Sequence, residues 1–134
     1  MAKLEQVEGI GDVYAQKLRG AGVATTDALL KQGATPKGRE EIAAKAGVSG
    51  KLILEWVNHV DLFRVTGVGE EYADLLEEAG VDTVPELAQR NAENLYQKLV
   101  TVNQEKALVR RLPSQVQVGG WIEQAKRLPR VITY

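Results

Sequence analysis

Two short glycine pairs mark the points in this sequence where backbone groups alone could bind a ligand. They are Gly9-Ile10-Gly11 and Gly67-Val68-Gly69, called here the first and second hairpins, and a helical pattern follows each. Glycine permits unusual backbone dihedrals, and a helix that begins there presents unpaired N–H groups beside the positive end of its dipole. Such a turn can hold an anion, notably phosphate.

The residues after the second glycine distinguish the two hairpins. Asp12 follows the first, and Glu70 and Glu71 follow the second. A carboxylate at this position stabilises the start of the helix, but it repels a phosphate. The first hairpin has basic residues close by in sequence, so we expect any phosphate contact there and a structural or protein-binding role for Gly67, Val68 and Gly69. The predicted nucleic-acid-binding residues are Gly9, Ile10, Gly11, Lys17, Arg19, Lys37 and Arg39.

Residues that could support catalysis or bind a metal are few. His59 is the only histidine and the chain has no cysteine, so a packed or surface histidine is favoured over a base or ligand. Ser49 and Ser114 are better explained as helix caps than as nucleophiles. We therefore predict a protein that is not an enzyme and that has no metal site or cofactor.

An internal repeat organises the helices that carry the hairpins. Gly67 lies 58 residues after Gly9, and many residues match at this offset: Val7 with Val65, Tyr14 with Tyr72, Leu18 with Leu76, Ala21-Gly22-Val23 with Ala79-Gly80-Val81, and Leu29 with Leu87. Further on, Trp56 finds its counterpart at Trp121, 65 residues later. So many coincidences indicate duplication. We expect an all-α fold of two four-helix repeats, residues 1–64 and 65–134, packed as one compact body.

Capping patterns predict where several helices begin and end. Gly22 and Gly80 are expected to end helices in the left-handed conformation. Thr83 to Glu86 and Ser114 to Gln117 have the pattern of a capping box, whereas Thr25 is expected to cap less completely. Thr35-Pro36 and Ser49 are expected to start two further helices. The two Trp residues are expected to fill the cores of their repeats.

Two features fit this pattern poorly. Gly119-Gly120 would lie inside the last helix, where each glycine costs about 1 kcal/mol relative to alanine, so a kink or a late start is expected. The tail 131–134 follows Pro129 and is expected to be too short to matter.

Composition restricts the class of protein. The 134 residues are 44% hydrophobic and 26% charged, with a net charge of −1, so the chain lacks the strongly basic character of a dedicated nucleic-acid binder. No apolar run reaches the roughly 18 residues that a membrane span needs. The absence of cysteine suits a reducing compartment, so we expect a cytoplasmic protein without a membrane partner.

Charge is unevenly distributed in the second half. Acids dominate residues 66–93, and the bases that follow are Lys98, Lys106, Arg110, Arg111, Lys126, Arg127 and Arg130. These bases could face phosphates, or they could neutralise the acidic stretch within the chain or in a neighbouring copy. The charge balance favours the second alternative, which predicts self-association that weakens as salt is raised.

The hairpin sequences resemble the helix-hairpin-helix superfamily, with its SAM-like arrangement of helices. Members often grip the nucleic-acid backbone without reading sequence, and some hairpins bind a monovalent cation. The whole chain, through Ala34-Thr35-Pro36-Lys37-Gly38-Arg39, Leu54-Glu55-Trp56-Val57-Asn58-His59 and Gly67-Val68-Gly69-Glu70-Glu71-Tyr72-Ala73, resembles a bacterial family catalogued as domain of unknown function 4332. That resemblance implies the fold and no activity.

Two functional hypotheses follow. The leading one is a binding module that holds DNA weakly and without sequence specificity through the first hairpin. The competing one is a protein-protein adaptor or self-assembling scaffold in which the hairpins are only structural. The same fold serves many roles, so the fold does not choose between them.

Overall fold

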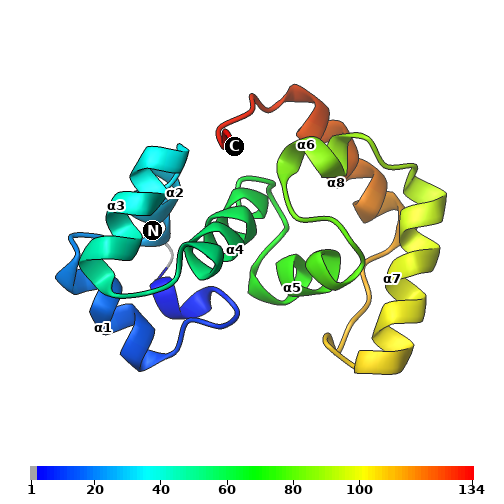
Figure 1. Ribbon diagram of the computed structural model, residues 1–134. Helices are drawn as coiled ribbons and strands as arrows, with labels where there is room; N and C mark the ends of the chain where they lie inside the picture. Colours follow the sequence, from blue (N-terminus) through cyan, green and yellow to red (C-terminus); the bar gives the residue numbers. More distant parts are fainter. Residues whose placement is uncertain (1–2) are drawn as a thin grey trace. The chain divides into compact units, whose positions relative to one another are not determined.

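Helices are the only regular secondary structure in the part of the chain that the structure describes. The computed structural model describes residues 3–134, and in this range it has eight α-helices, one short 3-10 helix and no strand (Figure 1). The residues divide into two compact units: unit 1 is Met1–Asp61 with Val131–Tyr134, and unit 2 is Leu62–Arg130. The predicted all-α class is confirmed.

Unit 1 contains one 3-10 helix and four α-helices, the last of which ends at the first residue of unit 2. They are η1 (Leu4–Gln6), α1 (Asp12–Gly20), α2 (Thr26–Gln32), α3 (Pro36–Ala46) and α4 (Gly50–Leu62). Side-chain oxygens cap three of them as the sequence predicts. Thr25 accepts from the Ala28 N–H at 3.1 Å, Thr35 from the Gly38 N–H at 3.0 Å, and Ser49 from the Leu52 N–H at 3.2 Å.

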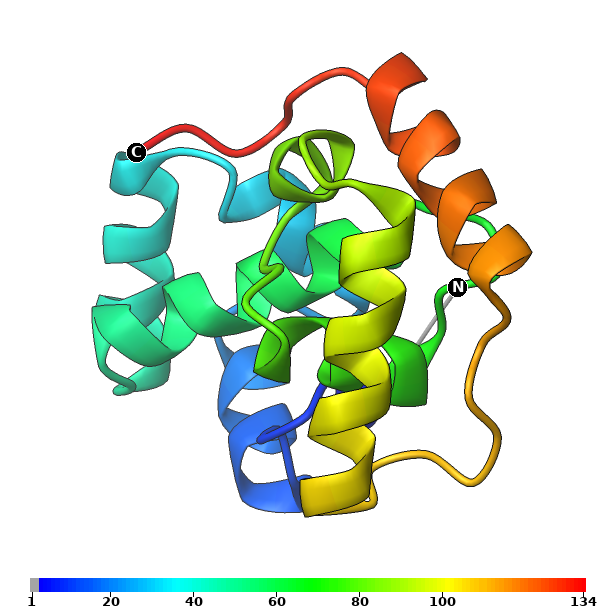
Figure 2. The ribbon, with the colours of Figure 1, turned by 90° about the vertical axis from the view of Figure 1, so that its right-hand side faces the viewer.

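Unit 2 contains α5 (Glu70–Glu78), α6 (Val84–Ala88), α7 (Ala92–Lys106) and α8 (Gln115–Arg127). Helix α8 packs on α6 and α7, and α7 also contacts α5 (Figure 2). The capping box at Ser114 and Gln117 is formed, so α8 begins at Gln115 and continues through Gly119 and Gly120. The expected late start is therefore wrong, because the cap fixes the helix start before the glycines.

Helices α1 and α5 end in the same way. Gly22 and Gly80 have φ of +87° and +93°. The N–H of Val23 donates to the Leu18 carbonyl at 2.9 Å, and the N–H of Val81 donates to the Leu76 carbonyl at 2.9 Å. Both ends are Schellman motifs. In this motif a residue in the left-handed conformation turns the chain so that following N–H groups donate to carbonyls of the last helical turn.

The cap of α6 differs from the prediction. The Thr83 side chain makes no capping hydrogen bond, and the Glu86 carboxylate accepts instead from the Asp82 N–H at 3.1 Å. Pro85 stands at the second helical position, where it removes one of the N–H groups that a cap could bind. The predicted capping box is wrong here, and Thr25 is the more complete cap of the pair.

Each tryptophan lies in a core, as expected. Trp56 and Trp121 are 2% and 3% exposed. Tyr14 packs at a tilt on Trp56 with ring centroids 5.1 Å apart, and Tyr72 packs on Trp121 at 5.3 Å. Burial of these large rings, with the aromatic contact, contributes strongly to the stability of both cores.

The tail Val131–Tyr134 belongs to unit 1 and is more important than expected. Ile132 is 3% exposed, and the Thr133 N–H donates to the Ala34 carbonyl at 2.8 Å. The Tyr134 hydroxyl donates to the Asn58 side-chain oxygen at 3.1 Å. Figure 2 shows the tail reaching the start of α3. The sequence predicts no role because four residues show no periodicity. In the structure their backbone makes a hydrogen bond to unit 1 and the Ile132 side chain is buried.

Candidate functional site

The first hairpin is a tight turn followed directly by a helix. The Ile10 N–H donates to the Val7 carbonyl at 3.0 Å, and Gly9 has φ +92°. A positive φ at the third residue of the turn defines type II and favours glycine. Ile10 is buried at 3% exposure, and Gly11 is the N-cap of α1 with φ −89° and ψ −171°. The turn is thus anchored by Ile10 while its glycines lie at the surface.

The second hairpin has the same backbone conformation. The Val68 N–H donates to the Val65 carbonyl at 3.0 Å, Gly67 has φ +96°, and Gly69 is the N-cap of α5 with φ −99° and ψ −164°. Val68 is 5% exposed, so it anchors this turn as Ile10 anchors the first. The two turns differ in the side chains around them and not in their backbone.

The two glycines of each hairpin have different roles. A Cβ at Gly9 would lie 3.3 Å from the Trp56 indole nitrogen, and one at Gly67 would lie 3.1 Å from the Trp121 indole nitrogen. At Gly11 and Gly69, a Cβ would meet nothing within 4 Å. The first glycine therefore fits the chain against a core tryptophan, and the second leaves open space in front of the helix N-terminus.

That open space lies over backbone donors without a side-chain cap. Glycine has no side chain, so Gly11 and Gly69 supply no acceptor to the first turns of α1 and α5. Side-chain oxygens cap α2, α3, α7 and α8 at Thr25, Thr35, Asn91 and Ser114. The first-turn N–H groups of a helix have no intrahelical partner, so they need water or an anionic ligand when no cap is present.

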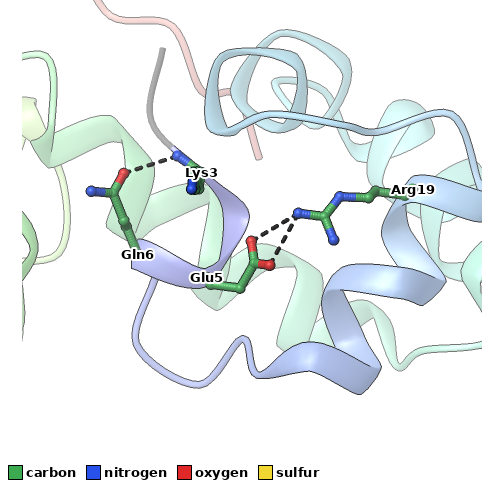
Figure 3. Close-up of polar contacts among 4 residues, drawn as sticks. All are labelled: Lys3, Glu5, Gln6 and Arg19. Carbon is green, nitrogen blue, oxygen red and sulfur yellow. Dashed lines mark hydrogen bonds and ion pairs between the residues drawn. The ribbon is translucent and has the colours of Figure 1, made fainter.

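Arg19, one of the predicted binding residues, is engaged by an acid of its own unit. Its guanidinium donates to both carboxylate oxygens of Glu5, at 2.9 and 3.1 Å (Figure 3). Hydrogen bonds from the backbone and then from Arg19 lower the pKa of Glu5. This contact is not predictable from local sequence, because the two residues are 14 positions apart on different helices.

Arg39 lies inside unit 1. It is 7% exposed and donates to the carbonyls of Gly33, Ala34 and Thr133 at 2.9, 3.2 and 2.7 Å. Its guanidinium also lies 5.7 Å from the centroid of the Tyr134 ring. The sequence predicts that Arg39 contacts nucleic acid. In the structure its side chain is buried and joins the loop before α3 to the tail.

The two predicted lysines are exposed but lie in different places. Lys17 is on α1, with its ammonium 5.8 Å from the centroid of the Tyr14 ring, on the helix that the first hairpin begins. Lys37 is in the first turn of α3, and both ribbon views place the start of α3 at the end of unit 1 away from the hairpin (Figures 1 and 2). Lys17 therefore lies on the helix that begins at the first hairpin, and Lys37 lies on a different helix.

Other residues considered for chemistry are placed as follows. His59 is 2% exposed on α4. Residues 3–134 hold no group of three or more His, Cys, Asp or Glu side chains arranged to bind a metal. No helix within the same residues combines the length and apolarity of a membrane span.

Bases of the second half pair with acids of the same unit. Lys126 makes an ion pair with Glu123, three residues earlier on α8, at 3.0 Å. Lys106 makes an ion pair with Glu78, and hydrogen bonding to that carboxylate raises the pKa of Lys106. Arg110 and Arg111 are exposed.

Comparison with known proteins gives one result. No curated protein and no solved structure matches this chain significantly. The family model described as Domain of unknown function (DUF4332) matches residues 8–128, which begin at the first hairpin and extend past the end of α8. The chain therefore belongs to the DUF4332 family.

Proposed function

We propose that this chain is a non-catalytic, cytoplasmic binding module of the helix-hairpin-helix type, whose first hairpin holds the backbone of nucleic acid weakly and without sequence preference. The observation that carries the proposal is the uncapped start of α1 behind Gly11, where a Cβ would meet nothing within 4 Å. A phosphate oxygen fits this position because it can accept from several first-turn N–H groups at once.

The side chains near the hairpins favour unit 1 over unit 2 for this contact. Lys17 is an exposed base on α1, whereas its counterpart 58 residues later is Leu75, which is buried. The second hairpin is followed by Glu70 and Glu71, and no base lies on α5. Like charge next to the donors opposes a phosphate there, so the second hairpin serves as an internal comparison.

Fluorescence anisotropy of labelled single- and double-stranded DNA tests the proposal. We expect weak binding by the parent protein that falls steeply between 50 and about 200 mM salt, because phosphate contacts release counterions. Lys17→Ala should weaken binding to all sequences similarly, and Lys37→Ala should leave it unchanged. Absence of binding at low salt, or a salt-insensitive complex, would contradict the proposal.

A protein partner is the second candidate, and one observation favours it. Val13, in the first turn of α1, is 66% exposed, and the preceding Asp12 and the hairpin residue Glu8 are also exposed. An exposed apolar side chain in an acidic segment suits contact with a basic protein surface or with a second copy better than contact with phosphate. Sedimentation at low and high salt tests the second copy, whose association should weaken as salt is raised.

A further inference from the structure

Each unit carries a groove where its first two α-helices end beside its third α-helix. In unit 1 the groove is lined by Ala21, Gln32, Gly38, Glu41, Ile42 and Lys45. In unit 2 it is lined by Ala79, Gln89, Arg90, Asn91, Asn94, Leu95 and Lys98. The two grooves measure about 190 and 550 Å³.

The residues that build the two grooves correspond. Gln32 donates to the Gly22 carbonyl at 3.3 Å, and Arg90, which lies 58 residues after Gln32, donates to the Gly80 carbonyl at 3.0 Å. Each donor therefore ties the end of the second helix to the glycine that ends the first. Ala21 and Ala79, the residues before those glycines, complete the match.

The third helix contributes the same spacing in both grooves. Glu41 and Lys45 lie four residues apart on α3, and Asn94 and Lys98 lie four residues apart on α7. Residues four apart lie on one face of a helix. A buried apolar residue, Ile42 or Leu95, stands next to the first of each pair. The grooves therefore share one construction.

Their charges differ. In unit 1 the groove has one acid and one base, Glu41 and Lys45, beside the neutral Gln32. In unit 2 the position of the glutamine is taken by Arg90, and the lining residues include Lys98 and Asn94, so the groove has two bases and no carboxylate among them. Glu86 and Glu93 are close in sequence but do not line it, and the Glu86 carboxylate accepts from the Asp82 N–H.

We propose that the groove of unit 2 at the junction of α5, α6 and α7 is a binding site for an oxyanion of the phosphate type. The hydrogen bond from the Arg90 guanidinium to the Gly80 carbonyl holds this side chain in place. A guanidinium has five N–H groups, so other donors remain for a ligand. Lys98 adds a second positive charge, and the amides of Gln89 and Asn94 add neutral donors. An arginine fork with a nearby ammonium matches phosphate in both charge and shape.

This site is separate from the first hairpin, which belongs to unit 1, so it does not depend on the proposed function. The phosphate group could be a free ion or part of a phosphodiester. Both sources present the same oxygens to the groove, and the two probes below separate them.

The test is a ¹⁵N NMR titration with inorganic phosphate and, separately, with a short oligothymidylate, at constant ionic strength. The matched variant Arg90→Gln with Asn94→Glu gives the groove of unit 2 the charges that the unit 1 groove has, one acid and one base. It should fold, because Gln32 makes the same bond to its glycine carbonyl and position 94 is exposed. We expect saturable shifts of the 89–98 signals in the parent and at least about tenfold weaker binding in this variant.

The reciprocal variant, Gln32→Arg with Glu41→Asn, should create saturable phosphate shifts around residues 32–45. Tighter binding of oligothymidylate than of inorganic phosphate identifies a phosphodiester as the ligand, and the reverse order identifies the free ion. The proposal is overturned if neither probe gives saturable shifts at 89–98, or if the Arg90→Gln, Asn94→Glu protein binds as tightly as the parent.

Discussion

The guanidinium of Arg39 donates a 2.7 Å hydrogen bond to the carbonyl of Thr133, 94 residues further along the chain. The same side chain donates to the carbonyls of Gly33 and Ala34, so one buried cation joins the start of α3 to the tail. Buried carbonyls that lose their donor are costly, so this contact should contribute measurably to the stability of unit 1.

Replacement of this arginine tests that contribution. Arg39→Ala should lower the free energy of unfolding by about 2–4 kcal/mol, because it removes the donor from the Gly33 and Thr133 carbonyls, one of the donors to Ala34, and leaves a space in the interior. Urea denaturation followed by circular dichroism measures the change. Lys37→Ala, on the exposed face of the same helix, is the control and should change stability by less than about 0.5 kcal/mol. Equal effects of the two substitutions would contradict the structural role of Arg39.

Removal of residues 131–134 should act through the same contacts. The deletion exposes the site of Ile132 and removes the Thr133 acceptor, so we expect it to destabilise unit 1. Its effect should not add to that of Arg39→Ala, since both changes break one network. The double variant, measured by urea denaturation, gives the coupling, and strictly additive losses would show that the tail and Arg39 act independently.

The hairpin glycines should respond unequally to substitution. Gly67→Ala should destabilise the protein by about 1–2 kcal/mol or more, because alanine is strained at φ +96° and its Cβ would lie 3.1 Å from the Trp121 nitrogen. Gly69→Ser should be neutral or stabilise by a few tenths of a kcal/mol, because serine is a good N-cap and the space is open. Thermal unfolding of both variants compares them, and the reverse order would refute the roles assigned to the two positions.

The end of α7 offers a stabilising change. Ala107 has φ +50°, a left-handed conformation that favours glycine, and it is the only non-glycine residue with a positive φ within residues 3–134. Ala107→Gly should stabilise the protein by up to about 1 kcal/mol, since relief of strain exceeds the greater flexibility of the unfolded chain. Gly47 occupies the corresponding position after α3 with φ +68°. A lower unfolding midpoint for Ala107→Gly would contradict this reasoning.

Low pH should weaken the contact between Glu5 and Arg19. Because the pKa of Glu5 is lowered in the folded protein, the interaction stabilises the fold above the ordinary glutamate pKa and is lost as pH falls through the lowered value. The pair is exposed, so the effect should be small. In NMR titrations, Arg19→Gln should raise the Glu5 pKa only in part, because the backbone hydrogen bond is the larger cause of the shift. An unchanged pKa in this variant would show that Arg19 does not contribute.

The sequence predicts the helices well where signals are local. Both Schellman glycines and the Ser114 capping box have the expected form, because each depends on a few neighbouring residues. The cap at Thr83 fails because Pro85 changes which N–H groups are present. Local signals also place both hairpin turns, in which the first glycine, Gly9 or Gly67, has a positive φ and the second, Gly11 or Gly69, is extended.

The side chains of the candidate site are harder to predict from sequence, because residues distant in sequence bind them. Arg19 and Arg39 have the charge that a phosphate contact needs, but one bonds to Glu5 and the other to the tail. No sequence pattern within several residues of Arg19 or Arg39 predicts these contacts. Net charge near a motif therefore overstates the charge that is free to bind a ligand.

The most direct test of phosphate binding at the first hairpin introduces a side-chain N-cap into the open space in front of α1. Gly11→Asp puts a carboxylate in front of the α1 N–H groups, where it can accept from them as an N-cap, and a Cβ there meets nothing within 4 Å. Gly69→Asp makes the same change at α5. Anisotropy of labelled DNA at low salt should show binding by the parent, unchanged binding by Gly69→Asp and at least tenfold weaker binding by Gly11→Asp, with all three proteins folded. Equal binding by Gly11→Asp and the parent would contradict the assignment of phosphate contact to the first hairpin.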